Sequence, residues 1–266
     1  MATITSLQNP RVKDTVRLRD RRHREKQGRI LIDGARELRR AIESGLGVLE
    51  IYHCPALCTN HEAQLTLELL PRCGAELIEV SDAVFEKLAF GDRAEGVLGV
   101  AAMPARQLHD LKLGAVPLLA VLEGVEKPGN VGAVLRSADG AGFDALILAD
   151  AKTDLYNPNA IRASLGTIFT MQVCAATSAA TRAWLDARGI QVVAARVDGS
   201  VPYTTLDYRK PTAIALGSEA EGLTPAWSGA GIVAARLPML GTADSLNVSA
   251  TAAVLFYEAR RQRNAT

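Results

Sequence analysis

Three polar loops in the second half of the sequence carry the residue types that could bind a charged ligand and act on a hydroxyl group. The first loop holds Asn130 and Arg136, the second holds Glu219, and the third ends at Asn247. A guanidinium binds anions, side-chain amides both donate and accept hydrogen bonds, and a carboxylate orients such donors. Each loop comes after an apolar stretch, so together they fit one binding site better than three unrelated turns.

The first loop is similar to a phosphate-binding loop but departs from it. Gly124-x4-Gly129 has the first spacing of a P-loop, whereas Asn130-Val131 stands where Lys-Ser/Thr would hold phosphate and magnesium. No Gly-x-Gly-x-x-Gly comes after a predicted strand, which disfavours a dinucleotide site. We expect Asn130 to cap a helix and Arg136 to lie about two turns into it. Arg136 is costly to bury there without an anionic partner, and an ordinary surface arginine is the alternative.

The second loop begins at a glycine, whereas the third leads into a helix. In the second, Gly217 permits close backbone approach and Glu219 comes just after it. The helix after the third loop is rich in small residues, and Asn247 is able to satisfy the free N–H groups of its first turn or a ligand. Met239 and Leu240 could lie on a flat heteroaromatic ring. An ordinary capped helix is the alternative for the third loop.

A parallel sheet is the element that would position these loops. Continuous apolar stretches separated by helical segments are typical of an α/β sheet covered on both faces. In open sheets of this kind the ligand lies outside the carboxyl ends of the strands, where the three loops begin. The predicted strands span residues 118–122, 145–148, 171–175, 191–195, 213–216 and 232–237.

A smaller alternating α/β unit precedes this sheet. We predict a domain over residues 1–105, a linker over 106–116 that contains Gly114, and a second domain over 117–266. In the first domain, strands are predicted at 30–32, 49–52, 76–80 and 97–101, and helices at 35–44, 62–71 and 82–89.

The basic charge is concentrated at the N-terminus. Residues 1–40 carry 12 Lys and Arg against 5 Asp and Glu, although the net charge of the whole chain is only +1. A charged helix is predicted over residues 10–26, with Arg17, Arg21 and Arg24 among its basic residues. Such a segment neutralises phosphates without reading a sequence, so we expect it to bind RNA. A solvated helix without a partner is the alternative.

The composition excludes several classes of protein. With 266 residues, 48% apolar and 22% charged, the chain can bury a real core. No apolar run reaches the length of a membrane span and no signal peptide is apparent, so we expect a cytoplasmic protein with no membrane contact. His53, Cys54, Cys58 and His61, with Cys73 beyond, could suggest zinc, but the spacing is not that of a known knuckle and we predict no metal.

Three segments, taken in order, carry a family resemblance. GNVGAVLRSADGAG, ALGSEAEGL and LPMLGTADSLNVSATAAVLFYEA resemble the three motifs of the SpoU (TrmH-type) branch of the SPOUT methyltransferases, over roughly residues 117–262. That family transfers a methyl group from S-adenosylmethionine to a ribose 2′-hydroxyl of RNA. The first 105 residues are similar in style to the L30e-like substrate-binding domain of many ribosomal RNA members.

The resemblance implies a fold and a cofactor site that the residue pattern alone does not. It implies a C-terminal trefoil knot, a feature too rare to infer from periodicity, and a homodimer formed through the catalytic domain. It also implies S-adenosylmethionine bent within the knot and held largely by backbone groups at Leu216, Gly217, Leu237, Pro238, Met239 and Leu246.

The resemblance further assigns catalytic positions. Arg136 matches the arginine to which the family's activation of the 2′-hydroxyl is assigned, and Asn130, Glu219 and Asn247 match other polar motif positions. An arginine is a poor general base because its guanidinium stays protonated, so stabilisation of the developing alkoxide stands beside deprotonation. We expect Asn130 and Asn247 to bond the target nucleotide or fix the loops, and Glu219 to orient them.

The sequence favours one class of RNA substrate but leaves alternatives open. The separate N-terminal domain favours 23S ribosomal RNA over transfer RNA, although a transfer RNA 2′-O-methyltransferase remains an alternative. A non-catalytic RNA-binding or ribosome-assembly protein on the same fold is a second alternative, disfavoured because no motif position is lost. An ordinary nucleotide-dependent enzyme is disfavoured by the missing phosphate-binding motifs.

Overall fold

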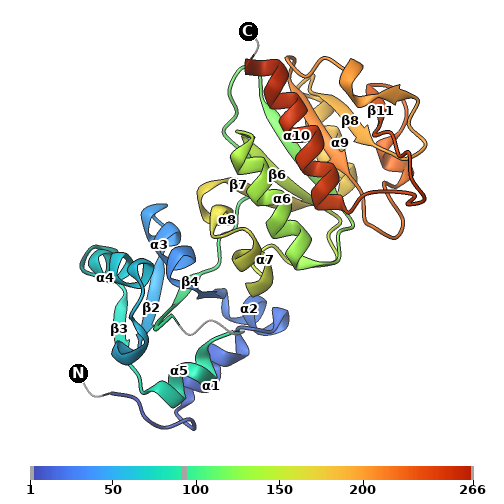
Figure 1. The fold of residues 1–266 in the computed structure, drawn as a ribbon. Helices are drawn as coiled ribbons and strands as arrows, with labels where there is room; N and C mark the ends of the chain where they lie inside the picture. Colours follow the sequence, from blue (N-terminus) through green and yellow to red (C-terminus); the bar gives the residue numbers. More distant parts are fainter. Residues whose placement is uncertain (1–2, 91–94, 265–266) are drawn as a thin grey trace. The chain divides into compact units, whose positions relative to one another are not determined.

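The computed structural model describes residues 3–90 and 95–264 and divides into two compact units, each with its own sheet (Figure 1). A short segment from the second half of the sequence groups with the N-terminal unit. Unit 1 comprises Met1–Pro104 and Tyr156–Thr170, and unit 2 comprises Ala105–Leu155 and Met171–Thr266.

Unit 1 is built on a mixed four-stranded sheet in the order β1-β4-β2-β3. β4 is antiparallel to both β1 and β2, whereas β2 and β3 are parallel. Every strand and helix predicted between residues 30 and 102 is present, within a few residues at each end. The elements are β1 (Arg29–Asp33), α3 (Ala35–Glu43), β2 (Val48–His53), α4 (His61–Cys73), β3 (Glu76–Glu79), α5 (Asp82–Leu88) and β4 (Val97–Ala102).

The N-terminal basic segment forms two helices, α1 (Pro10–Arg17) and α2 (Arg21–Gln27), so the single helix predicted over residues 10–26 is wrong. Leu18, at the end of α1, is fully buried in the core of unit 1. The Asp20 carboxylate then accepts a hydrogen bond from the Arg22 backbone N–H at 2.9 Å and caps a new helix. Burial of the apolar side chain and the cap together interrupt what reads as one charged run.

Two short helices, α7 (Pro158–Ala163) and α8 (Thr167–Thr170), complete unit 1. The Arg40 Nη1 atom donates to the Leu165 carbonyl at 2.7 Å. Gly166 packs so closely that an added Cβ would lie 3.0 Å from the Glu37 Cα atom. No pattern in the sequence indicates these contacts, and the domain limits 1–105 and 117–266 stay a proposal.

Unit 2 contains a seven-stranded sheet in the order β7-β6-β5-β10-β8-β11-β9, in which every described pairing is parallel. The six predicted strands are confirmed, and the seventh is the two-residue β9. The strands are β5 (Leu118–Glu123), β6 (Ala145–Ala149), β7 (Gln172–Ala176), β8 (Gln191–Ala195), β9 (Val201–Pro202), β10 (Thr212–Leu216) and β11 (Ile232–Arg236).

Helices α6 (Pro128–Gly140) and α10 (Val248–Asn264) pack side by side, whereas α9 (Ser178–Asp186) contacts β6 and β8 (Figure 1). Because β10 lies between β5 and β8, and β11 lies beyond β8, strands distant in sequence end next to one another. The loops after these strands are thereby gathered at one edge of the sheet. The trefoil knot stays a prediction.

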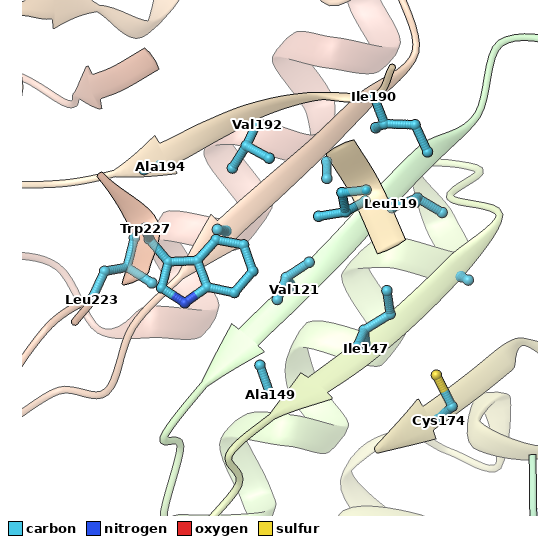
Figure 2. Close-up of a cluster of buried hydrophobic side chains, with 14 of the residues drawn as sticks. Leu119, Val121, Ile147, Ala149, Cys174, Ile190, Val192, Ala194, Leu223 and Trp227 are labelled. Carbon is cyan, nitrogen blue, oxygen red and sulfur yellow. The ribbon is translucent and has the colours of Figure 1, made fainter. Parts of the chain in front are cut away.

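The core of unit 2 explains why its strands read as continuous apolar runs. Figure 2 shows Leu119, Val121 and Ile147 in a buried cluster with the ring of Trp227. Leu111 joins the same cluster, so part of the segment predicted as a linker packs on unit 2. Among the described residues, none of the helices has both the length and the apolarity to cross a membrane.

Candidate active site

The carboxylate of Glu219 connects the loops that come after β5, β10 and β11. Its Oε2 atom accepts a hydrogen bond from Lys127 Nζ at 2.5 Å. Its Oε1 atom accepts one from Asn130 Nδ2 at 3.0 Å and another from Asn247 Nδ2. Three of the four side chains predicted as catalytic are therefore in direct contact. We call Lys127, Asn130, Glu219 and Asn247 the Glu219 hub.

A tight turn after β10 places Glu219. An added Cβ on Gly217 would lie 2.0 Å from the carbonyl carbon of Gly222, so only glycine fits there. The Gly222 N–H donates to the Ser218 carbonyl at 3.0 Å, and the Ser218 hydroxyl accepts from the Glu221 N–H at 3.1 Å. Gly222 has a φ of 68°, a left-handed conformation that glycine adopts without strain. The turn is closed by its own backbone.

Asn130 reaches the hub from the first turn of α6, and the prediction that it caps this helix is wrong. Helix α6 begins at Pro128, and Lys127 occupies the capping position without a side-chain bond to the helix. Proline is suited to a first helical position because its φ is already helical and it lacks an N–H group. Asn130 therefore lies inside the helix, where its amide is free to reach Glu219.

Asn247 is held at both ends of its amide. Its Oδ1 atom accepts hydrogen bonds from the Ser249 backbone N–H at 2.9 Å and from the Ser249 hydroxyl at 2.6 Å. Its Nδ2 atom donates to Glu219. The oxygen thus caps the start of α10, as its position before the helix indicated, while the nitrogen links α10 to the hub.

Arg136 is not part of the Glu219 hub. It lies about two turns into α6, as predicted, on the exposed face of a helix whose other face buries Val131, Val134 and Leu135. Within residues 3–90 and 95–264, no side chain forms a hydrogen bond or ion pair with its guanidinium. The full set of donors on this group is thus available to a substrate.

A cavity of about 660 Å³ lies beside the hub at the carboxyl ends of β8, β10 and β11. Its lining includes five of the six residues expected to hold the cofactor. The sixth, Pro238, is exposed and does not line it. The five residues are Leu216, Gly217, Leu237, Met239 and Leu246.

The cavity has the size and character that S-adenosylmethionine requires. Its volume is in the range of small-molecule sites, and the aliphatic side chains of Leu216, Leu237 and Met239 offer apolar contact to a purine. The charged residues in its lining are mostly carboxylates, a setting that favours a sulfonium cation. The carboxylates are those of Asp198, Glu219, Glu221 and Asp244.

The ion pair between Lys127 and Glu219 keeps both groups charged. The hydrogen bond from Lys127 holds the pKa of Glu219 below its ordinary value, with the bonds from Asn130 and Asn247 acting in the same direction. The same contact raises the pKa of Lys127. Glu219 consequently acts as an acceptor for three donors and does not serve as a proton donor at neutral pH.

Two residues that support the site, Lys127 and Glu123, have no counterpart in the sequence-based prediction. Glu123, the last residue of β5, is a carboxylate only 2% exposed. It accepts hydrogen bonds from the Ser178 hydroxyl at 2.6 Å and from both the backbone N–H and the hydroxyl of Thr224 at 2.7 Å. A carboxylate at the end of an apolar strand is the signal that could have found Glu123, whereas no pattern marks Lys127.

The three arginines predicted to bind RNA occupy different environments in unit 1. Arg17 and Arg21 are exposed, and each forms an ion pair at 2.8 Å with a nearby acid, Asp14 and Glu25 respectively. The prediction for Arg24 needs correction, because its side chain is 1% exposed.

Arg24 instead joins α2 to the end of α1. Its Nη1 atom donates to the carbonyls of Leu18 and Arg19, both at 2.7 Å. A guanidinium can close a helix terminus in this way because it carries several donors in one plane. Arg11 is exposed but pairs with Glu50 and Glu76. The other exposed basic residues of this segment are Lys13, Arg17, Arg21, Arg22 and Lys26, which we call the basic surface.

The cysteines and histidines near α4 do not gather around one point. His61 begins α4 and Cys73 ends it, which separates their backbones by about 18 Å along the helix axis. Cys54 is buried, and its thiol donates to Asp82 Oδ1 at 3.1 Å. In the part of the chain that the structure describes, no three metal-ligating side chains form a cluster.

Comparison with known proteins identifies the family. The model of the SpoU rRNA methylase family matches residues 117–257, which include all three loops of the site. The chain belongs to the SpoU rRNA methylase family. Residues 9–99 match a second model, that of the MRM3-like substrate-binding domain.

Relatives in the SpoU family match along almost the whole chain. The 23S rRNA (uridine(2479)-2′-O)-methyltransferase of Streptomyces viridochromogenes is 30% identical over 92% of this chain and 87% of its own. The 23S rRNA (guanosine(2553)-2′-O)-methyltransferase RlmP of Bacillus subtilis strain 168 is 27% identical over 98% of this chain and 100% of its own.

Solved structures show the same fold. A crystal structure described as an RNA 2′-O ribose methyltransferase superimposes with a TM-score of 0.87 at 42% identity, covering 99% of this chain and 100% of that one. The AdoMet-bound rRNA methyltransferase from Sinorhizobium meliloti gives a TM-score of 0.87 at 30% identity, covering 98% and 97%. The similarity to these structures therefore covers both units.

Proposed function

We propose that this chain transfers a methyl group from S-adenosylmethionine to a ribose 2′-hydroxyl of ribosomal RNA, with 23S RNA favoured. The observation that carries the proposal is the Glu219 hub, which joins Asn130 and Asn247 at the mouth of a cavity fit for that cofactor. The relatives from Streptomyces viridochromogenes and Bacillus subtilis, both named for 23S rRNA 2′-O-methylation, support the choice of substrate.

The residues of the cavity would hold the cofactor by shape and by backbone groups. Gly217 contributes only backbone to the cavity lining, and Leu237, Met239 and Leu246 supply apolar contact. S-adenosylmethionine, when bound, supplies an electrophilic methyl group. The hub fixes Asn130 and Asn247 relative to that cavity, so that a nucleotide bonded to them approaches in one orientation.

Arg136 would act on the hydroxyl. Its exposed guanidinium can donate to the 2′-oxygen as negative charge develops there and to a neighbouring phosphate in the same plane. The proton of the hydroxyl leaves to solvent or to the phosphate, since a guanidinium is already protonated. Arg136 and the hub would thereby hold the 2′-oxygen where the methyl group of a bound cofactor could reach it.

The remaining parts of the proposal concern assembly and substrate binding. The basic surface of unit 1 would hold RNA by its phosphates.

The catalytic domain would form a homodimer, for which the exposed side chains of Val254 and Tyr257 on α10 offer apolar contact. An enzyme with this substrate would act in the cytoplasm.

Transfer of a radiolabelled methyl group from S-adenosylmethionine to separated 23S, 16S and transfer RNA tests the function. We expect label in 23S RNA, at a position that resists alkaline cleavage because its 2′-oxygen is blocked. Label confined to transfer RNA would show that transfer RNA, and not ribosomal RNA, is the substrate. Absence of label in every RNA, with normal cofactor binding, would favour a non-catalytic role.

A further inference from the structure

One charged pair in the cavity has no counterpart in the three motifs. Arg196 and Asp198 come directly after β8 and line the cavity of about 660 Å³. Nε of Arg196 donates to Asp198 Oδ1 at 2.8 Å, and Nη2 donates to Oδ2 at 3.0 Å. The contact occupies one edge of the guanidinium in a bidentate arrangement.

The second edge of the Arg196 guanidinium is open to a ligand. A guanidinium carries five N–H donors in one plane, of which the contact with Asp198 uses two. The other three lie on Nη1 and Nη2, which form a second fork that matches a carboxylate. Among the described residues, no acceptor bonds to Nη1, and the side chain is 28% exposed.

The turn that carries Arg196 is fixed against the neighbouring strand. The Arg196 backbone N–H donates to the Ala235 carbonyl at 2.9 Å. An added Cβ on Gly199 would lie 2.8 Å from the carbonyl carbon of Ala235, so the turn packs closely against β11 at a position that only glycine fits. Arg196 is also the only basic residue of the described chain in the lining of this cavity, which contains four carboxylates.

We propose that the free edge of Arg196 binds the α-carboxylate of the cofactor's methionine end, and that Asp198 orients the guanidinium for this contact. The inference rests on the proposed function and deepens it. The acidic lining suits the sulfonium and the ammonium of the cofactor but repels its carboxylate. A single oriented arginine satisfies the carboxylate without neutralising the rest of the site.

Two ligands that carry an uncharged thioether in place of the sulfonium can test the contact between Arg196 and the carboxylate. S-adenosylhomocysteine keeps the amino acid end, whereas 5′-methylthioadenosine lacks it and retains the adenosine and the thioether. Calorimetric titration of the full chain with each ligand should show that Arg196→Ala weakens binding of S-adenosylhomocysteine by about 10- to 100-fold. Binding of 5′-methylthioadenosine should change by less than about twofold, since it makes no such contact.

Arg209→Ala is the matched control. Arg209 forms a similar exposed pair, with Nε donating to Asp207 Oδ1 at 2.8 Å, away from the cavity lining. It should leave both affinities unchanged. Asp198→Asn should weaken S-adenosylhomocysteine binding less than Arg196→Ala, because the guanidinium remains but loses its orientation.

Three results would overturn the assignment. Unchanged binding of S-adenosylhomocysteine to the Arg196→Ala variant would show that the carboxylate lies elsewhere, including the case in which Arg196 serves the smaller cavity of about 390 Å³ that it also borders. Equal losses for both ligands would mean that Arg196 only shapes the cavity. A native chain that binds neither ligand would overturn the proposed function together with this inference.

Discussion

The buried carboxylate of Glu123 accepts two hydrogen bonds from Thr224, one from its backbone N–H and one from its hydroxyl, both at 2.7 Å. This contact joins the end of β5 to the end of the loop that contains Glu219. The Ser178 hydroxyl donates to the same carboxylate at 2.6 Å and brings in the first turn of α9. One buried acid thus holds together two segments on which the site depends.

Removal of this carboxylate should destabilise unit 2. Glu123→Ala leaves the buried hydroxyl of Ser178 without its acceptor and removes the acceptor of the N–H and hydroxyl of Thr224, an exposed residue, at a cost of about 2 kcal/mol. Both tryptophans, Trp184 and Trp227, lie in unit 2, so urea unfolding monitored by tryptophan fluorescence reports on this unit.

The exposed neighbour Glu126 provides the comparison for Glu123. Its carboxylate pairs with Lys152 at 2.7 Å, on the surface, and Glu126→Ala should leave the unfolding midpoint nearly unchanged. Equal midpoints for the two variants would show that the bonds to Glu123 contribute nothing to the fold.

Replacement of the acceptor in the Glu219 hub should affect turnover more than stability. Glu219→Gln keeps one oxygen that can accept from the two asparagines but places an NH2 donor against Lys127, so the ion pair is lost and the hub is displaced. We expect methyl transfer to fall by about 10- to 100-fold, because displacement of a positioning group by about 1 Å can cost that much. The melting temperature should change little, since the hub is at the surface.

Glu126→Gln is the control in the loop after β5. Its side chain is 55% exposed and pairs with Lys152 at 2.7 Å, outside both the hub and the cavity lining. Full activity in this variant and a loss in Glu219→Gln would assign the effect to the hub. Similar losses in both would point to a general effect of charge on RNA binding.

The convergence of Glu219, Asn130 and Asn247 could be predicted because it results from strand order alone. Continuous apolar strands indicate a parallel sheet, and a parallel sheet places the polar residues after its strands at one edge. The contacts within the hub could not be predicted. Lys127 meets Glu219 across 92 residues of sequence, and no local pattern encodes such a pair.

The errors in prediction have a common cause, which is that local capping signals compete with tertiary contacts. Asn130 looked like a cap, but Pro128 already begins the helix and Glu219 takes the amide. Arg24 looked like a surface residue in a basic run, but the burial of Leu18 turned the chain and left carbonyls that a guanidinium could satisfy.

Arg136→Ala should lower the rate of methyl transfer by about 100-fold or more. Cofactor binding and the melting temperature should stay near those of the native chain. The side chain is exposed and makes no contact within the described chain that its loss would break. Arg136→Lys should recover little activity, since an ammonium cannot hold the 2′-oxygen and a phosphate in one plane. Turnover in the alanine variant close to the native rate would remove Arg136 from the mechanism.

A buried acid in unit 1 should give this protein a specific dependence of stability on pH. Asp33 is 4% exposed and accepts a hydrogen bond from the Phe90 N–H at 2.5 Å. Burial raises its pKa from 3.8 to about 6. Between those two pH values the folded state binds more protons than the unfolded state, so the free energy of unfolding falls as the pH rises through this window.

Asp33→Asn should remove that dependence. The amide oxygen can still accept from Phe90, and no charge is buried at high pH. The stability of the variant relative to the native chain should rise as the pH increases from about 4 to 6, reaching on the order of 3 kcal/mol above that window. Urea unfolding monitored by circular dichroism at several pH values measures the free energy of unfolding of both chains, and Asp14→Asn serves as a surface control. If the difference in free energy of unfolding between the variant and the native chain does not change with pH, Asp33 does not titrate in this range.

The basic surface should set the salt dependence of RNA binding. Lys13, Arg22 and Lys26 are exposed and have no hydrogen-bond or ion-pair partner among the described residues, unlike Arg17 and Arg21. Their joint replacement by alanine should make the slope of log K against log salt concentration shallower by about 2 to 3, since each phosphate contact contributes roughly 0.7 to 0.9. Binding of 23S RNA fragments at several salt concentrations measures the slope.

A triple variant that loses the same charge in unit 2 tests whether RNA phosphates contact the basic surface or are attracted only by the net charge of the chain. Alanine at Lys112, Arg188 and Lys210, which are exposed, lowers the net charge of the chain by the same amount but leaves the basic surface intact. Only the unit 1 variant should alter the slope if that surface contacts phosphates. Equal changes in both variants would indicate attraction by net charge alone, and an unchanged slope in the unit 1 variant would leave the basic surface without a role in RNA binding.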